Sequence, residues 1–320
     1  MHDLAIVVVS TNEAHWLEPC LRTVLAHAGP IDLDIVVADN ASTDGTAEVV
    51  AGFPGARVVR CENRGFSHAN NRALMTCDAR YVLLLNPDTE IRDGTFAGLV
   101  AAMDARPEVG FASVRQVLPD GTLHPTIRRF PSPLRALGEA LGSERLGVGG
   151  AVLGERELAP EPYERETEAD WLTGAFMLLR RETLEGAGLL DERFFMSSEE
   201  TDLCFRVKAA GWRVVHLPAM TIVHHAGKRG CNPRMDAQYA FSRGLFARKH
   251  FAPGARAAYL AALGLRYGLR AVAPDRPSER NGDGALRRES ARLSLATLAG
   301  RRPPPFGAPP PFAVAPRRHA

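Results

Sequence analysis

The sequence has few of the features that mark secreted or membrane-spanning proteins. Its cysteines are few, odd in number and without a Cys-x-x-Cys pair: Cys20, Cys61, Cys77, Cys204 and Cys231. This pattern predicts free thiols in a reducing compartment rather than a disulfide framework. The start, MHDLAIVVVSTNEAH, has no basic segment and only a short apolar run, so no signal peptide is expected. Two arginines interrupt the longest apolar candidate for a membrane span, AAYLAALGLRYGLRAVA, and we therefore expect a cytoplasmic protein.

The sequence also lacks a strong charge of either sign, because its net charge is only +2. Residues 271–320 hold nine arginines, no lysine and four acidic residues, a charge of +5 that leaves −3 for residues 1–270. A basic tail on a nearly neutral body suits an anionic surface better than a sequence-reading groove, so no nucleic-acid partner is expected. With the basic helix predicted at 256–270, the tail favours peripheral contact with the inner face of the cell membrane. A basic tail that only aids solubility is the alternative.

The first 105 residues alternate between apolar runs and helical patterns. The runs predict buried strands at 4–10, 33–40, 56–61 and 80–88, and helices are expected between them and at 94–105. We place the start of the second helix at Ser42 or Thr43, either of which is a suitable cap. This alternation predicts βαβ units and an α/β fold with a mostly parallel central sheet flanked by helices.

The rest of the chain is less regular. A strand is expected at 109–117, a long irregular excursion at 119–165, a strand and short helix within 169–188, a helix at 199–210 and two short strands within 212–227. Residues 236–270 have a helical pattern, and the Pro-rich, basic last 50 residues are expected to be disordered. The predicted organisation is a domain at 1–230, a helical extension at 231–270 and a disordered tail at 271–320.

Polar residues follow each of the first four predicted strands. Ligands bind at the carboxyl ends of strands in open parallel sheets, so these residues are site candidates. No Gly-x-Gly-x-x-Gly or Walker loop is among them, which leaves a dinucleotide or P-loop site unsupported. Asp39 could accept hydrogen bonds from a nucleobase or ribose, or it could simply cap a turn. Asp88 could bind a hard divalent cation, or it could be an ordinary turn residue after Pro87.

Three later stretches are also candidates. His224 could be a metal or phosphate ligand, or it could pack against the sheet. Trp171, Gly174 and Ala175 suit a sugar face, or ordinary core packing. In FFMSSEETDLCF (194–205), Ser197 and Glu200 have the spacing of a helix capping box, whereas a carboxylate at a helix start facing a cleft could be a general base.

Seven of these stretches stand in one order that resembles family 2 glycosyltransferases, most of all the bacterial rhamnosyltransferase-like branch. They are IVVVSTN, VVADNASTDGT, NRGFSHANN, YVLLLNPDTEI, WLTGAFMLLRRE, GLLDERFFMSSEETDLCFRVKAAGWRV and VHHAG, and together they cover roughly residues 3–230. The resemblance implies a GT-A fold and transfer of a sugar from a nucleoside-diphosphate donor with inversion. The partners it implies are a nucleotide sugar, with dTDP-rhamnose the first choice, and a glycan or lipid-linked acceptor in cell-surface polysaccharide synthesis.

The resemblance also implies roles for individual residues. Those matching the nucleotide-sugar site are Ser10, Glu13, Asp39, Gly65, Asn70, Asn71 and Asn86. Asp88 and His224 match the site of Mg²⁺ or Mn²⁺, and Trp171, Gly174 and Ala175 match the acceptor side. Glu200 matches the catalytic base, with Glu199 beside it.

The chain departs from the family's pattern at several positions. The usual Glu-Asp-x-Asp is Glu199-Glu200-Thr201-Asp202, so the base is one methylene longer than usual. Ser197 and Ser198 replace an aromatic pair, and Thr11 stands where Tyr is common. The alternatives are a non-catalytic relative that binds sugar nucleotides or glycans, and a glycosyltransferase with a small-molecule acceptor. A nucleotidyltransferase would carry a Gly-rich basic loop after the first strand, which STNEAHW is not.

Overall fold

The computed structural model describes residues 1–143, 150–225, 232–274 and 283–307. Its strands are β1 (His2–Ser10), β2 (Leu33–Asn40), β3 (Ala56–Cys61), β4 (Ala79–Leu85), β5 (Thr89–Asp93), β6 (Val109–Val117), β7 (Ile127–Arg128), β8 (Thr167–Glu168), β9 (Trp171–Leu172), β10 (Phe176–Arg180) and β11 (Arg213–His224). Its helices are α1 (Ala14–Ala26), α2 (Thr46–Ala51), α3 (Phe66–Leu74), α4 (Phe96–Asp104), α5 (Pro133–Leu141), α6 (Gly150–Leu153), α7 (Arg181–Ala187), α8 (Glu199–Ala209), α9 (Pro233–His250), α10 (Pro253–Val272) and α11 (Asp283–Leu298), with a 3₁₀ turn at Glu161–Tyr163.

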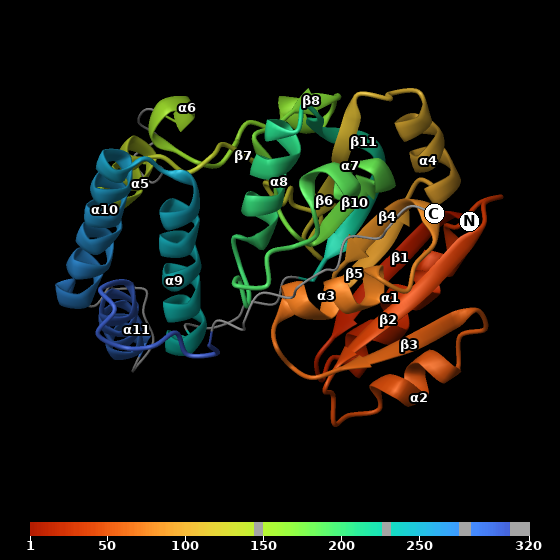
Figure 1. The fold of residues 1–320 in the computed structure, drawn as a ribbon, viewed down its shortest axis with the longest axis horizontal. Coiled ribbons are helices and arrows are strands. Elements are labelled where there is room, and N and C mark those ends of the chain that lie inside the picture. Colours follow the sequence, from red (N-terminus) through yellow and green to blue (C-terminus); the bar gives the residue numbers. More distant parts are fainter. Residues whose placement is uncertain (144–149, 226–231, 275–282, 308–320) are drawn as a thin grey trace.

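A mixed, mostly parallel sheet forms the centre of the larger domain, on the right in Figure 1. Within the described residues its order is β3-β2-β1-β4-β10-β6-β11-β5, with β8 added beside β11. Strands β3, β2, β1 and β4 are parallel, as their apolar runs predict, whereas β10 is antiparallel to both β4 and β6. The parallel strands bring the ends of β1, β2 and β4 to one edge of the sheet, where the site lies.

Helices cover both faces of the sheet. Apolar residues of α1, α2 and α4 pack on one face, and those of α3, α7 and α8 pack on the other. The sheet is therefore buried on both sides, which is why β1 is a continuous apolar run rather than an alternating one. This three-layer arrangement confirms the predicted α/β fold.

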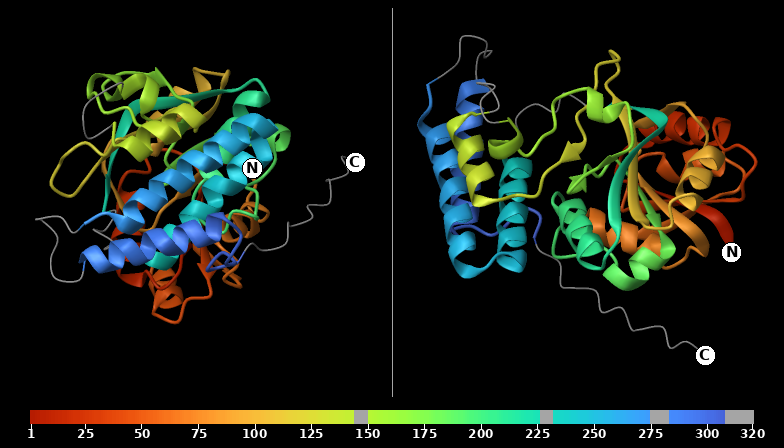
Figure 2. Two further views of the ribbon diagram at one scale, coloured as in Figure 1. Left: turned by 90° about the vertical axis from the view of Figure 1, so that its left-hand side faces the viewer. Right: turned by 90° about the horizontal axis from the view of Figure 1, so that it is seen from above.

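A separate helical bundle stands beside the sheet domain. It consists of α5, α9, α10 and α11 around a small apolar core that includes Ala136, Ala240, Tyr259, Leu263 and Tyr267. The left view of Figure 2 looks onto this bundle, with α5 and α10 side by side. Helices α9 and α10 occupy the segment predicted to be helical.

Two predictions about irregular segments were wrong. The excursion at 119–165 contains α5, which Ser132 caps by accepting a hydrogen bond from the Arg135 amide, and it joins the helical bundle. The tail expected to be disordered contains α11, which buries small residues such as Ala291 and Ser294 against the bundle. The nine prolines and nine arginines of residues 271–320 led to the prediction of disorder. Residues 308–320, Cys231 and the predicted domain boundary at 230 lie outside the described residues.

Two local predictions also differ from the structure. Where two short strands were expected within 212–227, the described residues form one long strand, β11, with a register shift between Leu217 and Thr221. Helix α2 begins after Gly45, so neither Ser42 nor Thr43 caps it. Instead, both residues bind Asn12 of the first loop: Ser42 Oγ accepts its amide hydrogen, and Thr43 donates to its side-chain oxygen. Of the helices in the described parts of the chain, none has both the length and the apolarity needed to cross a bilayer.

Candidate active site

A cleft of about 450 Å³ opens at the carboxyl ends of β1, β2 and β4. Many of the predicted site residues line it: Glu13, Gly65, Asn86, Asp88, Gly174, Ala175, Glu199, Glu200 and His224. They come from loops far apart in the sequence, and the sheet topology brings them together. Residues not predicted for the site also line it, among them Thr11, Asn40, Asn63, Phe195 and Phe306.

Asp88 and His224 face each other across this cleft. Strand β5 pairs antiparallel with β11, so that Thr89 lies opposite His224, and the His225 amide donates to the Asp88 carbonyl at 2.8 Å. This register places His224 Nε2 3.4 Å from Asp88 Oδ1, with both residues largely buried. The predicted pair therefore comes together, although β5 itself was not expected.

His124 is a site neighbour that the sequence analysis missed. Its Nδ1 lies 3.4 Å from Nδ1 of His224, on the side away from Asp88. Burial and the neighbouring His224 lower the pKa of His124 to about 4, so its ring is neutral at pH 7. His124 lies in the segment that was predicted to be irregular, and no sequence motif indicated a role for it.

The donor atoms at this place suit a hard divalent cation that completes its shell elsewhere. Asp88 offers a carboxylate oxygen and His224 a ring nitrogen, and a cation such as Mg²⁺ or Mn²⁺ usually takes further oxygens from substrate phosphates and water. Among the described residues there is no group of three or more His, Cys, Asp or Glu side chains arranged to hold a metal by themselves. The pair therefore fits a metal shared with a bound diphosphate, not an all-protein metal centre.

Glu199 and Glu200 begin helix α8 and lie at the base of the cleft. One carboxylate oxygen of each, Oε2, is buried without a hydrogen-bond partner among the described residues. Burial, together with the neighbouring charge of Glu200, raises the pKa of Glu199 well above its ordinary value. Burial also raises the pKa of Glu200, but backbone amides at the helix start and the charge of Arg128 oppose the shift. Of the two, Glu200 is therefore the one better able to be ionised at pH 7.

The loop before α8 has an unusual backbone. Ser197 and Ser198 both have positive φ angles, 67° and 69°, a left-handed conformation that few residues other than glycine adopt. The helix has Ser198 as its N-cap and no side-chain capping hydrogen bond, so the capping box of Ser197 and Glu200 is not formed. Such strain costs free energy and persists where the surroundings fix the backbone, often at functional sites.

The segment that begins helix α3 holds this loop in place beside the cleft. Gly65 (φ 104°) passes so close to the loop that an added Cβ would lie 2.4 Å from the Phe195 carbonyl oxygen. The Phe66 amide donates to the same carbonyl at 2.8 Å. Gly65 lines the cleft, as expected for a donor-side residue.

Asn70 and Asn71 do not line the cleft, contrary to expectation. Asn71 exchanges hydrogen bonds with the backbone of Leu190 and also donates to Glu192, and Asn70 donates to the Phe66 carbonyl. Both are buried in the layer between α3 and the chain that leads to α8. Both side chains turn inward, and the hydrogen bonds of Asn71 hold the chain that leads to α8 against helix α3.

At the ends of β1 and β2, too, some of the predicted site residues line the cleft and others do not. Ser10 is fully buried, and its hydroxyl contacts Thr46 Oγ1 at 3.3 Å. Asp39 accepts a hydrogen bond from the Ser42 amide at 2.9 Å, as the prediction that it caps a turn implies. Neither lines the cleft, whereas Glu13 and the unpredicted Asn40 do. Asn40 donates to Thr11 and Asn63 and so joins two loops of the cleft.

A second cavity, of about 690 Å³, lies on the other side of Glu200. Three residues line both cavities: Thr173, Ser197 and Glu200. Trp171 lines only the second cavity, and its indole N–H donates to the Arg129 carbonyl at 2.9 Å. The predicted acceptor-side residues are thus divided, with Trp171 in the second cavity and Gly174 and Ala175 in the first.

Comparisons with known proteins agree with this geometry. The family model described as "Glycosyl transferase family 2" matches residues 5–159. N-acetylglucosaminyl-diphospho-decaprenol L-rhamnosyltransferase of Mycobacterium tuberculosis is 31% identical over 236 residues, which is 69% of this chain and 76% of that protein. This chain belongs to glycosyl transferase family 2. As a family 2 glycosyltransferase it is also similar to rhamnosyltransferase WbbL of Escherichia coli, at 25% identity over 69% of this chain and 83% of WbbL.

Solved structures show the same fold as this glycosyltransferase. The mannosyltransferase PcManGT of Pyrobaculum calidifontis, solved with GDP-Man and Mn²⁺, superposes with a TM-score of 0.58 at 18% identity, covering 94% of this chain and 88% of that one. Staphylococcus aureus TarS (1–349) superposes with a TM-score of 0.50 at 13% identity, covering 94% and 92%. The fold is therefore GT-A, as the sequence predicted.

Proposed function

We propose that this glycosyltransferase moves a sugar from a nucleoside diphosphate to an acceptor hydroxyl with inversion, and that Glu200 is its general base. One observation carries the proposal: Glu200 lines both cavities, and it shares the first with Asp88. A base at that boundary would meet the acceptor on one side and the donor sugar on the other. The similarity to two rhamnosyltransferases supports dTDP-rhamnose as the donor and a glycan or lipid-linked acceptor in cell-surface polysaccharide synthesis.

The proposed reaction is a single displacement. The acceptor oxygen forms a bond to the anomeric carbon while the bond from that carbon to the diphosphate oxygen breaks. The electron pair leaves with the nucleoside diphosphate, and the acceptor proton passes to the Glu200 carboxylate. Burial of Glu200 raises its pKa and makes it a stronger base than an exposed carboxylate, and the charge of Arg128 helps to keep it ionised.

Asp88 and His224 would hold Mg²⁺ or Mn²⁺ together with the donor diphosphate, the kind of ion present in the mannosyltransferase of the same fold. When bound, the cation would neutralise negative charge on the leaving diphosphate. The residues proposed to bind the rest of the donor are Glu13, Gly65 and Asn86 in the cleft and Asp39 at the end of β2. The Asn86 amide donates to the Ala175 carbonyl, which keeps the loop after β4 beside the start of β10.

A non-catalytic relative is the alternative, and the missing capping box argues against it. Without the Ser197–Glu200 capping bond, the helix start gives Glu200 no side-chain capping role, and its carboxylate remains in the wall of the cleft. Glu199 holds its proton more firmly and is proposed as a neighbour that shapes the site, not as the base.

A thermal-shift panel of nucleotide sugars, with and without Mn²⁺, tests the proposal. A donor that binds the folded state raises the melting temperature, and we expect at least one nucleotide sugar to do so more strongly with Mn²⁺. Asp88→Ala should remove that metal-dependent shift. Asp93→Ala, a matched change at the exposed end of β5 outside the cleft, should keep it. The proposed donor site would be rejected if Asp88→Ala kept the metal-dependent shift, or if no nucleotide sugar raised the melting temperature of the wild type.

A further inference from the structure

The chain that follows helix α11 returns to the candidate active site. Gly300 (φ 71°) lies just after the helix, and the Arg301 amide donates to the Ala296 carbonyl at 2.8 Å, which turns the chain away from the helix axis. Residues 303–305 are all proline, and proline fixes its own φ angle and so stiffens the segment. The segment passes the lower end of α9 in Figure 1, and Phe306 then forms part of the wall of the first cavity.

Helix α9 holds this segment in place. Arg234 donates to the Pro305 carbonyl at 3.2 Å, and its guanidinium lies 4.9 Å from the centre of the Phe306 ring. The Phe306 amide donates to Oε1 of Gln238, a residue that is only 1% exposed. Because Arg234 and Gln238 are four residues apart, they lie on one face of α9. The helical bundle therefore sets the position of the Phe306 ring.

The ring of Phe306 also packs on the loop that leads to α8. It lies nearly parallel to the ring of Phe195, with 5.3 Å between the ring centres and 15° between the planes, a separation within the favourable range for aromatic pairs. Both residues line the first cavity, together with polar side chains such as Asp88 and Glu199. The two rings thus add an aromatic surface to a largely polar cleft.

This aromatic pair borders the place where the proposed reaction puts the donor sugar. The diphosphate is proposed to lie at Asp88, and Glu200 must reach the hydroxyl that attacks the anomeric carbon. The sugar must then lie between these two residues, which share the cleft with the pair. Phe195 belongs to the loop that leads to Glu200, and its carbonyl is packed closely against Gly65 on the other side. A sugar in this place would therefore lie next to the aromatic surface.

We propose that Phe306 binds the sugar of the donor, so that the segment after α11 completes the donor site. Part of the surface of a sugar ring consists of C–H groups, which pack favourably against an aromatic side chain in a concave site. Contacts with Phe195 and Arg234 already hold the ring, so little ordering is needed when the donor binds.

This inference rests on the proposed function, because it takes Asp88 and Glu200 as the groups on either side of the donor sugar. It adds a binding residue from a segment that the sequence analysis expected to be disordered. The segment also lies beyond residues 5–159, the part of the chain that the family model matches. Phe306 is therefore a feature of the donor site that the family match does not supply.

Three other roles for Phe306 would have different consequences. A ring that only supports the loop before α8 would affect every ligand of the cleft alike. A ring that contacts the nucleobase would affect the nucleotide with or without its sugar. A ring that blocks the cleft would oppose binding, and its removal would raise the affinity. Only the sugar-binding role predicts a loss that is confined to the sugar part of the donor.

Calorimetric titration of the full chain with dTDP-rhamnose and with dTDP, both in the presence of Mn²⁺, separates these roles. We expect Phe306→Ala to weaken dTDP-rhamnose binding about tenfold, because apolar contact with the ring is lost, and to leave the affinity for dTDP within about twofold of the wild type. Phe306→Tyr keeps the ring and should bind dTDP-rhamnose nearly as the wild type does. Arg302→Ala, an exposed position of the same segment outside the cleft, is the matched control and should change neither affinity.

The outcomes also distinguish this inference from the proposed function. An equal loss of affinity for both ligands in Phe306→Ala would overturn the inference in favour of loop support or a nucleobase contact, and tighter binding would overturn it in favour of a blocking role. Unchanged binding of both ligands would show that the ring does not meet the donor. If the thermal-shift panel identifies another donor, that nucleotide sugar and its own nucleoside diphosphate replace the two probes. The proposed function itself fails only if the wild type binds no nucleotide sugar, or if Asp88→Ala keeps the metal-dependent binding.

Discussion

The carboxylate of Asp88 and the imidazole of His224 lie 3.4 Å apart, one after β4 and the other at the end of β11. The pairing of β5 with β11 fixes this distance, because it sets Thr89 opposite His224 and ties the His225 amide to the Asp88 carbonyl. His225 is next in sequence but has a different environment. Its Nε2 contacts Glu90 at 2.5 Å, and its ring packs on Trp16.

This difference predicts unequal effects of two adjacent substitutions. His224→Gln should weaken Mn²⁺-dependent donor binding about tenfold or more, because an amide is a poorer metal ligand than imidazole. His225→Gln should leave that binding near the wild-type value, since His225 does not line the cleft. Titration of donor with Mn²⁺ measures both, and a larger loss in His225→Gln would contradict the assignment.

Gly65 predicts a stability effect with a matched control. An added Cβ there would lie 2.4 Å from the Phe195 carbonyl oxygen, in addition to the cost of a positive φ. Gly121 has a similar φ of 83° but open space around it, so its substitution shows the backbone cost alone. Gly65→Ala should lower the free energy of unfolding by about 1–3 kcal/mol more than Gly121→Ala, the range expected for an overpacked site. Urea denaturation measures the difference, and equal losses would show that the loop before α8 can move away.

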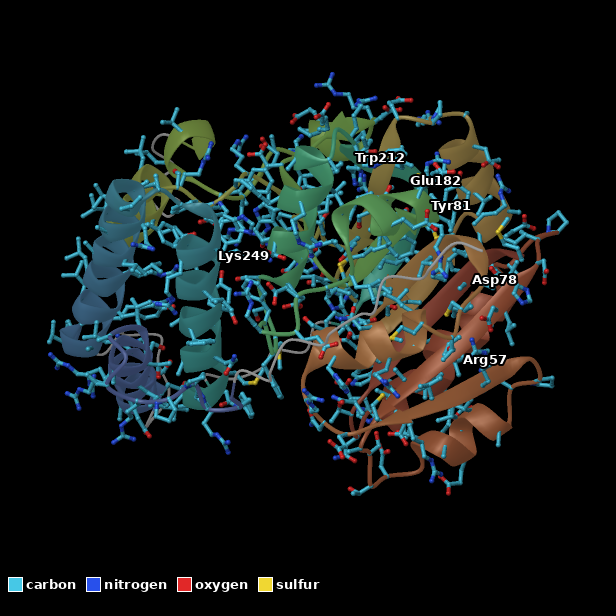
Figure 3. The ribbon with its side chains drawn as sticks, viewed as in Figure 1. Arg57, Asp78, Tyr81, Glu182, Trp212 and Lys249 are labelled. Carbon is cyan, nitrogen blue, oxygen red and sulfur yellow. The ribbon has the colours of Figure 1, made fainter. Side chains whose placement is uncertain are left out.

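Asp202 fastens helix α8 to the bundle. It is fully buried, and it binds Arg206 of its own helix and Lys249 and His250 of α9, at 2.7–2.9 Å. Figure 3 shows Lys249 between α9 and α8. Asp202→Asn should cost about 3 kcal/mol at pH 7, because it removes the carboxylate that pairs with Arg206 and one of the two carboxylates that bind Lys249. Glu18→Gln, which breaks an exposed pair with Arg22 at the same i,i+4 spacing, should cost less than about 0.5 kcal/mol.

The effect of Asp202 should also depend on pH. Burial alone would raise its pKa, but hydrogen bonds from His250 and Lys249 and the charges of Arg206 and Lys249 lower it below the ordinary 3.8. A lowered carboxylate pKa stabilises the folded state above the unfolded pKa, and that contribution disappears as the pH falls through the folded pKa. The stability gap between the wild type and Asp202→Asn should thus be full above about pH 4 and shrink below it. Urea midpoints from pH 3 to pH 7 test this, and a constant gap would contradict the ionic role.

The parts of the fold that could be predicted from the sequence are those with a strong local signal. The apolar runs of β1, β2 and β4 mark buried strands, and the motifs after them mark the edge where the cleft lies. Strand β5, TEIRD, has no such signal because only Ile91 and Thr89 are buried. Helix α11 was missed because its fully buried positions hold small residues such as Ala291 and Ser294, while the leucines that pack beside them, Leu295 and Leu298, are only partly buried.

Only those site residues that lie in sequence motifs could be predicted. Asp88, His224 and Glu200 lie in motifs and come together in the structure. Asn71 lies in a motif too, but its side chain turns inward, and a motif does not reveal the direction of a side chain. Most of the second cavity could not be predicted, because its lining comes from segments far apart in the chain, among them β7, α5, α10 and α11, which meet only when the bundle packs beside the sheet domain.

The central claim is that Glu200 removes the acceptor proton, and the rate of sugar transfer by Glu200→Gln tests it most directly. Gln keeps the size of the side chain and cannot take the proton, so we expect transfer to fall about 10²–10⁴-fold while donor affinity stays near the wild-type value. Glu199→Gln, the matched change one residue earlier, should retain far more activity, because burial and the charge of Glu200 raise the pKa of Glu199 and make it the less suitable base. Transfer at the wild-type rate by Glu200→Gln, with loss in Glu199→Gln instead, would contradict the account.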